Sequence, residues 1–214
     1  MLIESLTQSF NRTVRALAGR QDEVQALGTS DTSDEAAAFR AIQDRLGPMY
    51  RDIFFDDNAP RTVVVDPSLS LDQEVLAKIS GVHHYEERML CLLLLLRLPR
   101  TEVIFLTSKP VPETIIDYYL HMLPGIPAQH ARRRLKLFSC HDGSAIPLTE
   151  KLLARPRLLA RIRQAISDPD RTHMTCFNVT ARERQLALAL DIPLYGCDPD
   201  LIDLGSKSGS RKIF

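Results

Sequence analysis

Glycine is scarce in this sequence, and the glycines that are present are not spaced for binding phosphate. The chain has nine glycines in 214 residues, well below the average of about 7% for soluble domains. None of them falls into the pattern GxGxxG or GxxxxGK[ST], which let a backbone approach a dinucleotide or a nucleoside triphosphate. The sequence therefore carries neither the dinucleotide-binding fingerprint nor a P-loop.

The chain also lacks an excess of charge and a long hydrophobic run. Lys and Arg number 27, as do Asp and Glu, whereas proteins that bind nucleic acid through bulk charge carry a clear positive excess. The longest uncharged apolar run, 89–96, is far shorter than the roughly 20 residues that span a bilayer. Residues 1–12 hold no continuous apolar segment of the kind found in signal peptides. We expect a soluble, cytoplasmic protein that binds neither nucleic acid nor membrane.

The four cysteines are too far apart for a common metal or disulfide motif. Cys91, Cys140, Cys176 and Cys197 show no CxxC spacing, so we expect neither a structural zinc site nor a dense disulfide framework. Cys91 lies in an apolar run, and Cys140 and Cys176 lie in strand-like segments. These three are predicted to be buried free thiols.

Residues 1–60 are predicted to form a helical appendage that packs on the main domain. Their sequence predicts a first helix, then a polar loop at 28–31, and then a second helix. The second helix opens at 32–35, where Thr and Glu can satisfy each other's end of the helix as a capping box. It is expected to run through Phe39 and Ile42 and to stop at 47–48, a Gly-Pro pair.

From residue 61 onward, strand-like and helix-like segments alternate. Apolar or β-branched runs predict strands at 62–66, 102–107, 135–140, 173–179 and 192–195. The helical segment at about 84–98 contains a stretch that is apolar all round, so it is predicted to be a buried central helix. Alternating βα units of this size favour a Rossmann-like, doubly wound α/β fold over residues 61–196, with a mostly parallel sheet of four or five strands.

Polar residues follow four of the predicted strands. In open parallel sheets, ligands bind outside the carboxyl ends of the strands. We therefore predict that six residues lie together at one edge of the sheet and contribute to substrate binding: Asp66, Thr107, Ser108, His141, Asp142 and Asn178. The alternative is that these are ordinary strand ends, which are also rich in small polar residues.

Three other segments carry reactive or charged side chains, and for each we favour a structural role. Residues 83–88 contain two histidines and two glutamates but lack HEXXH spacing, and the acids suit the first turn of a helix. Cys140 and His141 are adjacent on an extended chain, so they are not expected to pair as nucleophile and base. Residues 132–163 hold nine basic residues against two acidic ones, an excess that phosphate or nucleic acid could bind. Because the whole chain is neutral and Phe138 is the only aromatic residue in this stretch, we favour a solvated helix face or a surface that packs against the acidic residues 1–60. We predict no catalytic residue and no metal ligand.

The end of the chain, together with earlier stretches, resembles a known enzyme superfamily. An acidic connector at 197–203 precedes Gly205-Ser206-Lys207, which opens a basic helix. Earlier stretches follow the same order, at 85–88 with the leucine run after it, 117–121, 137–142, 175–180 and 193–196. Over residues 60–214 this order resembles the pre-ATP-grasp domain of ATP-grasp carboxylate–amine ligases, and it is similar to the pheganomycin-type peptide ligases.

The resemblance implies a full-length enzyme that uses ATP and Mg²⁺ to convert a carboxylate into an acyl phosphate, which an amine then attacks. It implies that Lys207 approaches the nucleotide phosphates, and that residues 197–214 connect to an ATP-grasp domain following Phe214 in the same chain. We therefore expect neither ATP nor Mg²⁺ to bind to the 214 residues alone. One departure is Ser206, because many relatives have Asp at the position before the lysine.

Two functions of different class remain open. The first is the amino-terminal domain of an ATP-dependent peptide ligase, which would contribute to the binding of a small-molecule carboxylate and an amine. The second is a self-standing Rossmann-like binding or interaction module without catalysis. A reading frame that continues past Phe214 would favour the first, and a stop codon there would favour the second.

Overall fold

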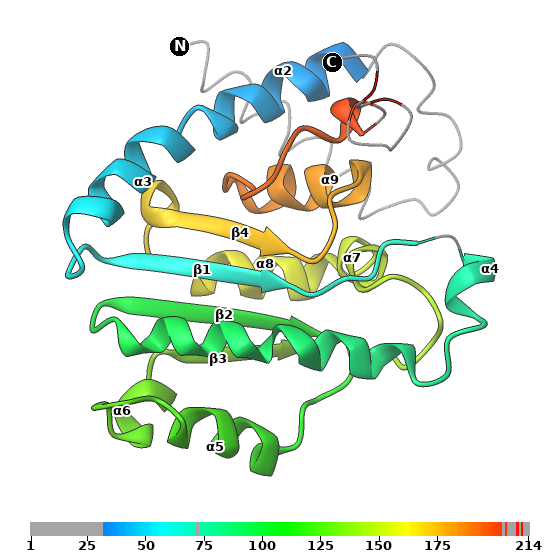
Figure 1. The fold of residues 1–214 in the computed structure, drawn as a ribbon. Coiled ribbons are helices and arrows are strands. Elements are labelled where there is room, and N and C mark those ends of the chain that lie inside the picture. The colour runs from blue at the N-terminus through cyan, green and yellow to red at the C-terminus, as the bar shows by residue number, and fades with distance from the viewer. Residues whose placement is uncertain (1–31, 72, 203, 205–208, 210, 212–214) are drawn as a thin grey trace.

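The computed structural model describes residues 32–71, 73–202, 204, 209 and 211 (Figure 1). The predicted first helix, the polar loop at 28–31 and Lys207 lie outside the described residues. Within the predicted connector, the structure describes one short 3₁₀ turn, η3 (Pro199–Leu201).

A four-stranded parallel sheet forms the centre of the described residues. Its strands are β1 (Arg61–Asp66), β2 (Thr101–Thr107), β3 (Leu135–Ser139) and β4 (Thr172–Cys176), in the order β3-β2-β1-β4. All three neighbouring pairs are parallel, so the Rossmann-like prediction is confirmed. Every residue of β1 is buried, because this strand lies between two others and is covered on both faces.

The predicted fifth strand is much shorter than expected. Only Leu194 makes a bridge to the sheet, in parallel with Met174 of β4. The Met174 amide donates to the Pro193 carbonyl, and the Tyr195 amide donates to the Met174 carbonyl. Pro193 has no amide hydrogen of its own to extend the ladder. This segment therefore extends the sheet at its β4 edge by a single bridge.

Helices cover both faces of the sheet (Figure 1). One face packs Val64, Ile104 and Met174 against α2 (Thr32–Gln43), α7 (Leu148–Leu153), α8 (Pro156–Ala165) and α9 (Ala181–Leu190). The other face packs Val63, Val65 and Phe105 against η1 (Val82–Arg97), α5 (Glu113–His121) and α6 (Ala128–Arg132). Two short elements, α4 (Gln73–Leu76) and η2 (Pro169–Arg171), lie in the connections.

The leucine-rich helix differs from the prediction in both its type and its burial. It is a 3₁₀ helix, η1, in which Leu90, Leu93 and Leu96 are fully buried. Because side chains in a 3₁₀ helix align at every third position, a second row points outward. In that row Leu94 is 42% exposed and Cys91 is also exposed. The predicted burial of the helix therefore holds for one row of leucines only, and the prediction that Cys91 is a buried thiol is wrong.

No helix in the described part of the chain is long and apolar enough to cross a membrane.

The amino-terminal helices are joined to the main core. Phe39 and Ile42 of α2 belong to the same hydrophobic cluster as β1 and β4. The Gln43 side chain also donates to the Leu194 carbonyl and accepts from the Leu194 amide. Helical structure does not stop at residues 47–48 as predicted, because a second helix, α3 (Leu46–Phe55), begins there. Pro48 is tolerated in its first turn, where no intrahelical amide bond is lost.

The three-residue period of η1 leads to a test with two neighbouring leucines. We expect Leu93→Ala to lower the free energy of unfolding by about 2–5 kcal/mol, because it empties a fully buried position. Leu94→Ala should lower it by less than about 1 kcal/mol, because that side chain is partly exposed. Urea unfolding of both variants measures the difference. Equal losses would contradict the observed pattern of burial.

Candidate functional site

The six residues predicted from the strand ends do lie at one edge of the sheet. Asp66 and Thr107 are the last residues of β1 and β2, and Ser108 follows directly. His141 and Asp142 follow β3, and Asn178 follows β4. Since all four strands are parallel, these carboxyl ends share the same edge. Their part in substrate binding stays a prediction.

Four of the six side chains belong to two hydrogen-bonded groups, and the six differ in exposure. Asp66, Thr107 and Ser108 are buried, Asp142 and Asn178 are half-buried, and His141 is exposed. Asp66 and Asn178 belong to one group, and Ser108 and Asp142 to the other. The Thr107 hydroxyl donates to the Phe138 carbonyl of β3 over 3.4 Å, which ties two strand ends together.

Glu183 of α9 is the centre of the first group. Its Oε1 accepts hydrogen bonds from the hydroxyls of Ser70 (2.5 Å) and Thr149 (2.6 Å). Its Oε2 accepts from the amide (2.8 Å) and the hydroxyl (2.5 Å) of Thr180. The contacts with Thr180 form a capping box at the start of α9, the arrangement that a threonine followed three residues later by a glutamate favours. The same buried carboxylate thus caps α9 and also fixes the loop after β1 and the start of α7.

Asp66 and Glu183 share one hydroxyl, that of Thr149. Thr149 Oγ1 lies 2.8 Å from Asp66 Oδ2 and 2.6 Å from Glu183 Oε1, but a threonine has only one proton to donate. Burial, followed by the charge of Glu183, raises the pKa of Asp66 to about 7. A protonated Asp66 can donate to Thr149, which then donates to Glu183. All three side chains are fully buried, so this arrangement stores a proton inside the protein.

Asn178 connects β4 to the loop after β1. Its Oδ1 accepts from the Ser70 amide, and its Nδ2 donates to the Ser70 carbonyl, both over 3.0 Å. These two hydrogen bonds resemble those that a backbone residue of a neighbouring strand would make. The Ser70 hydroxyl lies between Ser68 and Glu183. These contacts fix the backbone at the point between β1 and β4 where the strand order reverses.

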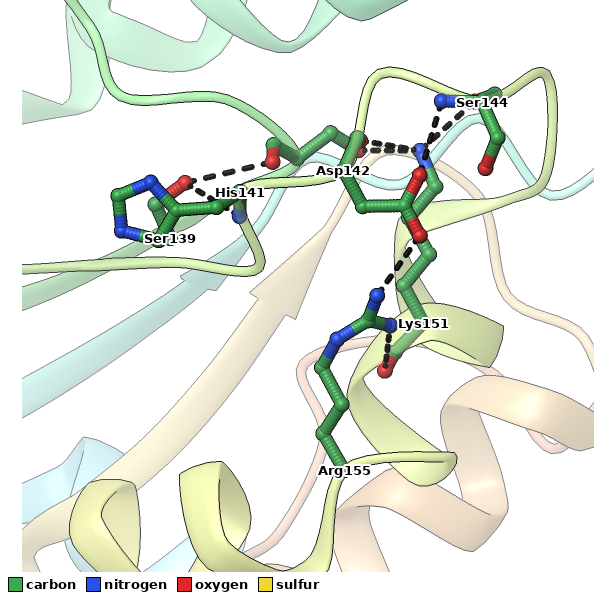
Figure 2. A network of polar contacts seen from close by, with 7 residues as sticks. Ser139, His141, Asp142, Ser144, Lys151 and Arg155 are labelled. Atoms are coloured by element: carbon green, nitrogen blue, oxygen red, sulfur yellow. Dashed lines mark hydrogen bonds and ion pairs between the residues drawn. The ribbon is translucent and has the colours of Figure 1, made fainter.

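The second group surrounds a buried lysine, Lys151 of α7 (Figure 2). Its Nζ donates to Ser108 Oγ (2.8 Å), to the Asp142 carbonyl (3.0 Å) and to the Ser144 carbonyl (2.8 Å). All three of its hydrogens therefore have acceptors. The Ser108 amide in turn donates to Glu86 Oε2 over 2.6 Å. Lys151 holds the ends of β2 and β3 together, and it has no hydrogen left for a substrate.

Asp142 is stabilised in its charged form. Its Oδ1 accepts from the Ser144 amide (2.9 Å), and its Oδ2 accepts from Arg155 (2.7 Å) (Figure 2). Hydrogen bonds from Ser144 are the largest cause that holds the pKa of this carboxyl well below its usual range, and Arg155 adds to them. Two carboxylates at the same edge, Asp66 and Asp142, thus have pKa values shifted in opposite directions.

Lys109 and His141 are exposed at this edge. The Lys109 side chain crosses the loop after β3 at Gly143, where an added Cβ would come within 2.2 Å of the lysine Cε. Gly143 therefore leaves room for the Lys109 side chain. Burial is the main cause that lowers the pKa of the nearby His83, and the charges of His84 and Lys109 add to it. The exposed Lys109 ammonium is a positive charge of the kind that pairs with a carboxylate group.

The histidines and glutamates at 83–88 and the thiol of Cys140 have structural surroundings. Glu86 is buried and bound to Ser108, while His84 contacts Glu87 over 3.0 Å. Among the described residues, no group of three or more His, Cys, Asp or Glu side chains is arranged to hold a metal ion. Burial raises the pKa of Cys140 to about 11, so its thiol stays protonated at neutral pH. Neither Thr149 nor Lys151 was recognisable from the sequence as part of this edge, whereas Lys109 directly follows the predicted strand end at 107–108.

The opposite pKa shifts of Asp66 and Asp142 predict opposite effects of pH on stability. An unfolded aspartate titrates near pH 3.9, and folded Asp66 titrates near 7. Between these values the folded protein binds the extra proton, so Asp66 makes the free energy of unfolding fall as pH rises, by at most about 1.4 kcal/mol per pH unit. We expect Asp66→Asn to gain stability relative to wild type between pH 4 and 8, as measured by urea unfolding.

Asp142→Asn is the matched control, with the opposite sign. The pKa of folded Asp142 is lowered, so its contribution is complete above pH 4 and is lost as pH falls further. The variant should be less stable than wild type at pH 7, and the difference should shrink below pH 4. Parallel pH profiles for both variants would show that the two carboxyls do not occupy the environments described.

Comparison with known proteins relates this chain to a ligase. No protein-family model and no solved structure matches it. The L-propargylglycine--L-glutamate ligase of Streptantibioticus cattleyicolor is 27% identical over 145 residues, which make up 65% of this chain and 30% of that enzyme. The chain thus spans less than a third of the relative's length. The similarity supports a ligase-related α/β domain.

Proposed function

We propose that this chain is the amino-terminal, substrate-binding domain of an ATP-dependent ligase that joins a carboxylate to an amine through an acyl phosphate. The observation that carries the proposal is the similarity to a ligase whose name specifies two amino acids as substrates. The Rossmann-like sheet with a polar carboxyl edge is consistent with it. By analogy, both substrates of this protein would be amino acids or short peptides.

The described residues supply binding and positioning rather than phosphoryl transfer. We assign them no step of the nucleotide chemistry. ATP and Mg²⁺ would be held by residues outside the described part, Lys207 among them. This agrees with a relative more than three times as long as the matched segment.

At the carboxyl edge, the buried groups set the shape and the exposed groups meet the substrate. Lys151, Glu183 and Asp66 are satisfied within the protein. Lys109 and His141 are exposed beside them, and the Lys109 side chain passes over Gly143. In the proposed function, the Lys109 ammonium pairs with a substrate carboxylate that is not the one undergoing reaction.

A ligation assay with the complete gene product tests this proposal. Mixtures of amino acids with ATP and Mg²⁺ should release ADP and give an amide product detectable by mass spectrometry. We expect Lys109→Gln to raise KM for one amino acid by about tenfold, the worth of one charge-assisted contact of about 1.4 kcal/mol. Arg133→Gln, which changes an exposed cation two residues before β3 and so at the opposite edge of the sheet, should leave KM unchanged. The absence of any ADP release with all amino-acid pairs would favour a non-catalytic binding module.

Lys207 provides a separate test of the relationship to ATP-grasp enzymes. A lysine ammonium at the start of a helix supplies a compact positive charge and free amide hydrogens for phosphate oxygens. We expect Lys207→Ala in the complete gene product to weaken ATP turnover by at least tenfold, and Ser208→Ala to have a much smaller effect. The 214-residue chain alone should neither bind nor hydrolyse ATP measurably by calorimetry or phosphate release. Wild-type turnover in Lys207→Ala would remove this lysine from the nucleotide site.

A further inference from the structure

Unsatisfied buried polar atoms gather at the other end of the sheet, where the strands begin. Among the described residues, five buried side-chain nitrogen or oxygen atoms have no hydrogen-bond partner. Four of them belong to three residues on neighbouring strands: Nε and Nη2 of Arg61, Oγ1 of Thr101 and Nδ1 of His173. Native proteins pair nearly all such groups, and an unpaired one costs about 1–3 kcal/mol or more when charged. A cluster of them calls for an explanation.

The three residues lie on the same face of the sheet. Arg61, the first residue of β1, is directly opposite Thr101, the first residue of β2. His173 of β4 is opposite Val63, and Val63 is two residues beyond Arg61 in β1. Because side chains alternate along a strand, Arg61, Thr101 and His173 all project from the face that η1 partly covers. The cluster spans three adjacent strands.

The free atoms of Arg61 have a geometry that suits one kind of partner. Nε and Nη2 lie along a single side of the guanidinium and present two parallel N–H groups, which match the two oxygens of a carboxylate. Arg184, the other buried arginine of the described part, shows the usual outcome. It is 6% exposed, against 9% for Arg61, and it pairs with Glu35, Asp198 and Asp200.

The groups around Arg61 favour a monoanion over a dianion. Asp56 and Asp57, at the end of α3, act on Arg61 electrostatically without forming an ion pair with it. Their negative charge opposes a phosphate dianion. The guanidinium of Arg134, on the β2 side, is occupied by the carbonyls of Leu96, Leu98 and Thr101. One free cation with acidic neighbours therefore matches a single carboxylate.

His173 and Tyr50 complete the surroundings as neutral groups. Burial, with a smaller effect of Arg61, lowers the pKa of His173 to about 4, and burial raises the pKa of Tyr50 to about 12. At neutral pH neither side chain is charged, and an uncharged imidazole donates through Nδ1 when that nitrogen holds the proton. The Tyr50 ring lies 5.3 Å from the His173 ring and 5.4 Å from that of Tyr195, which is 60% exposed.

We propose that Arg61, Thr101 and His173 bind the carboxylate group of a small molecule at the amino edge of the sheet. The two carboxylate oxygens accept from Nε–H and Nη2–H of Arg61, and Thr101 and His173 supply further donors. Both guanidinium nitrogens are covered, so binding requires that neighbouring side chains move to admit the ligand. This site lies at the opposite edge from Lys109 and His141, and it does not depend on the proposed ligase function.

Nuclear magnetic resonance of the ¹⁵N-labelled 214-residue chain tests the site directly. The side-chain Nε–H signal of Arg61, identified by its absence from Arg61→Met, should shift saturably with sodium acetate and with L-glutamate, but not with sodium chloride at equal ionic strength. A shift with both carboxylates indicates a general carboxylate site, and a shift with L-glutamate alone indicates an amino-acid site. Either result supports the proposal.

Variants separate binding from stability. Whichever of the two carboxylates shifts the signal should raise the Tm of wild type and of Arg184→Met, but not that of Arg61→Met. Arg61→Lys keeps the charge without the two parallel N–H groups, so it should weaken binding of that carboxylate at least tenfold even if Arg61→Met folds poorly. The proposal would be overturned if neither acetate nor L-glutamate gave a response greater than chloride, if a carboxylate-dependent Tm rise persisted in Arg61→Met, or if inorganic phosphate gave a stronger response than both carboxylates.

Discussion

The complete burial of β1 is the constraint on which the rest of the structure depends. This strand lies between β2 and β4, and all six of its residues are buried. Its apolar centre, Val63 to Val65, packs into the hydrophobic clusters on the two faces. Its two ends are polar. Arg61 and Asp66 therefore need hydrogen-bond partners inside the protein, because burial of an unpaired polar group destabilises the folded state. The two edges of the sheet differ in how they meet this requirement.

At the carboxyl edge the requirement is met by side chains from distant helices. Thr149 is 83 residues from Asp66 in sequence, and Lys151 is 43 residues from Ser108. Each hydrogen bond closes a long loop of chain and joins a strand end to α7 or α9. Buried polar networks that are fully satisfied rigidify their surroundings. These buried hydrogen bonds therefore hold the loops that carry Lys109 and His141 in position, as the proposed binding of a small substrate requires.

The sequence predicted the fold because the signals for the four strands are local. Runs such as Thr62-Val63-Val64-Val65 identify a buried strand without reference to the rest of the chain, and the parallel arrangement then places Asp66, Ser108 and Asn178 at one edge. The period of η1 was not predictable, because leucine at every position from 92 to 96 fits a 3₁₀ helix as well as an α-helix. Thr149 and Lys151 carry no local signal, since a threonine and a lysine in a short helix are ordinary surface residues in sequence terms. Glu183 was visible as a helix cap, but its contact with Ser70 was not.

The contrast between Arg184 and Arg61 shows how the two ends of the sheet differ physically. Both guanidiniums are buried to nearly the same extent, so both have lost a similar share of their hydration. Arg184 regains that energy from three carboxylates on α2 and the segment after residue 197, and it thereby holds the amino-terminal helix onto α9. Arg61 regains none of it from a hydrogen bond or ion pair within the described residues. Removal of one partner from a buried pair is strongly destabilising because it leaves the other charge uncompensated. Arg61 has no such direct partner, although the charges of Asp56 and Asp57 act on it from a distance. A carboxylate bound there would therefore gain the interaction energy without first breaking an ion pair.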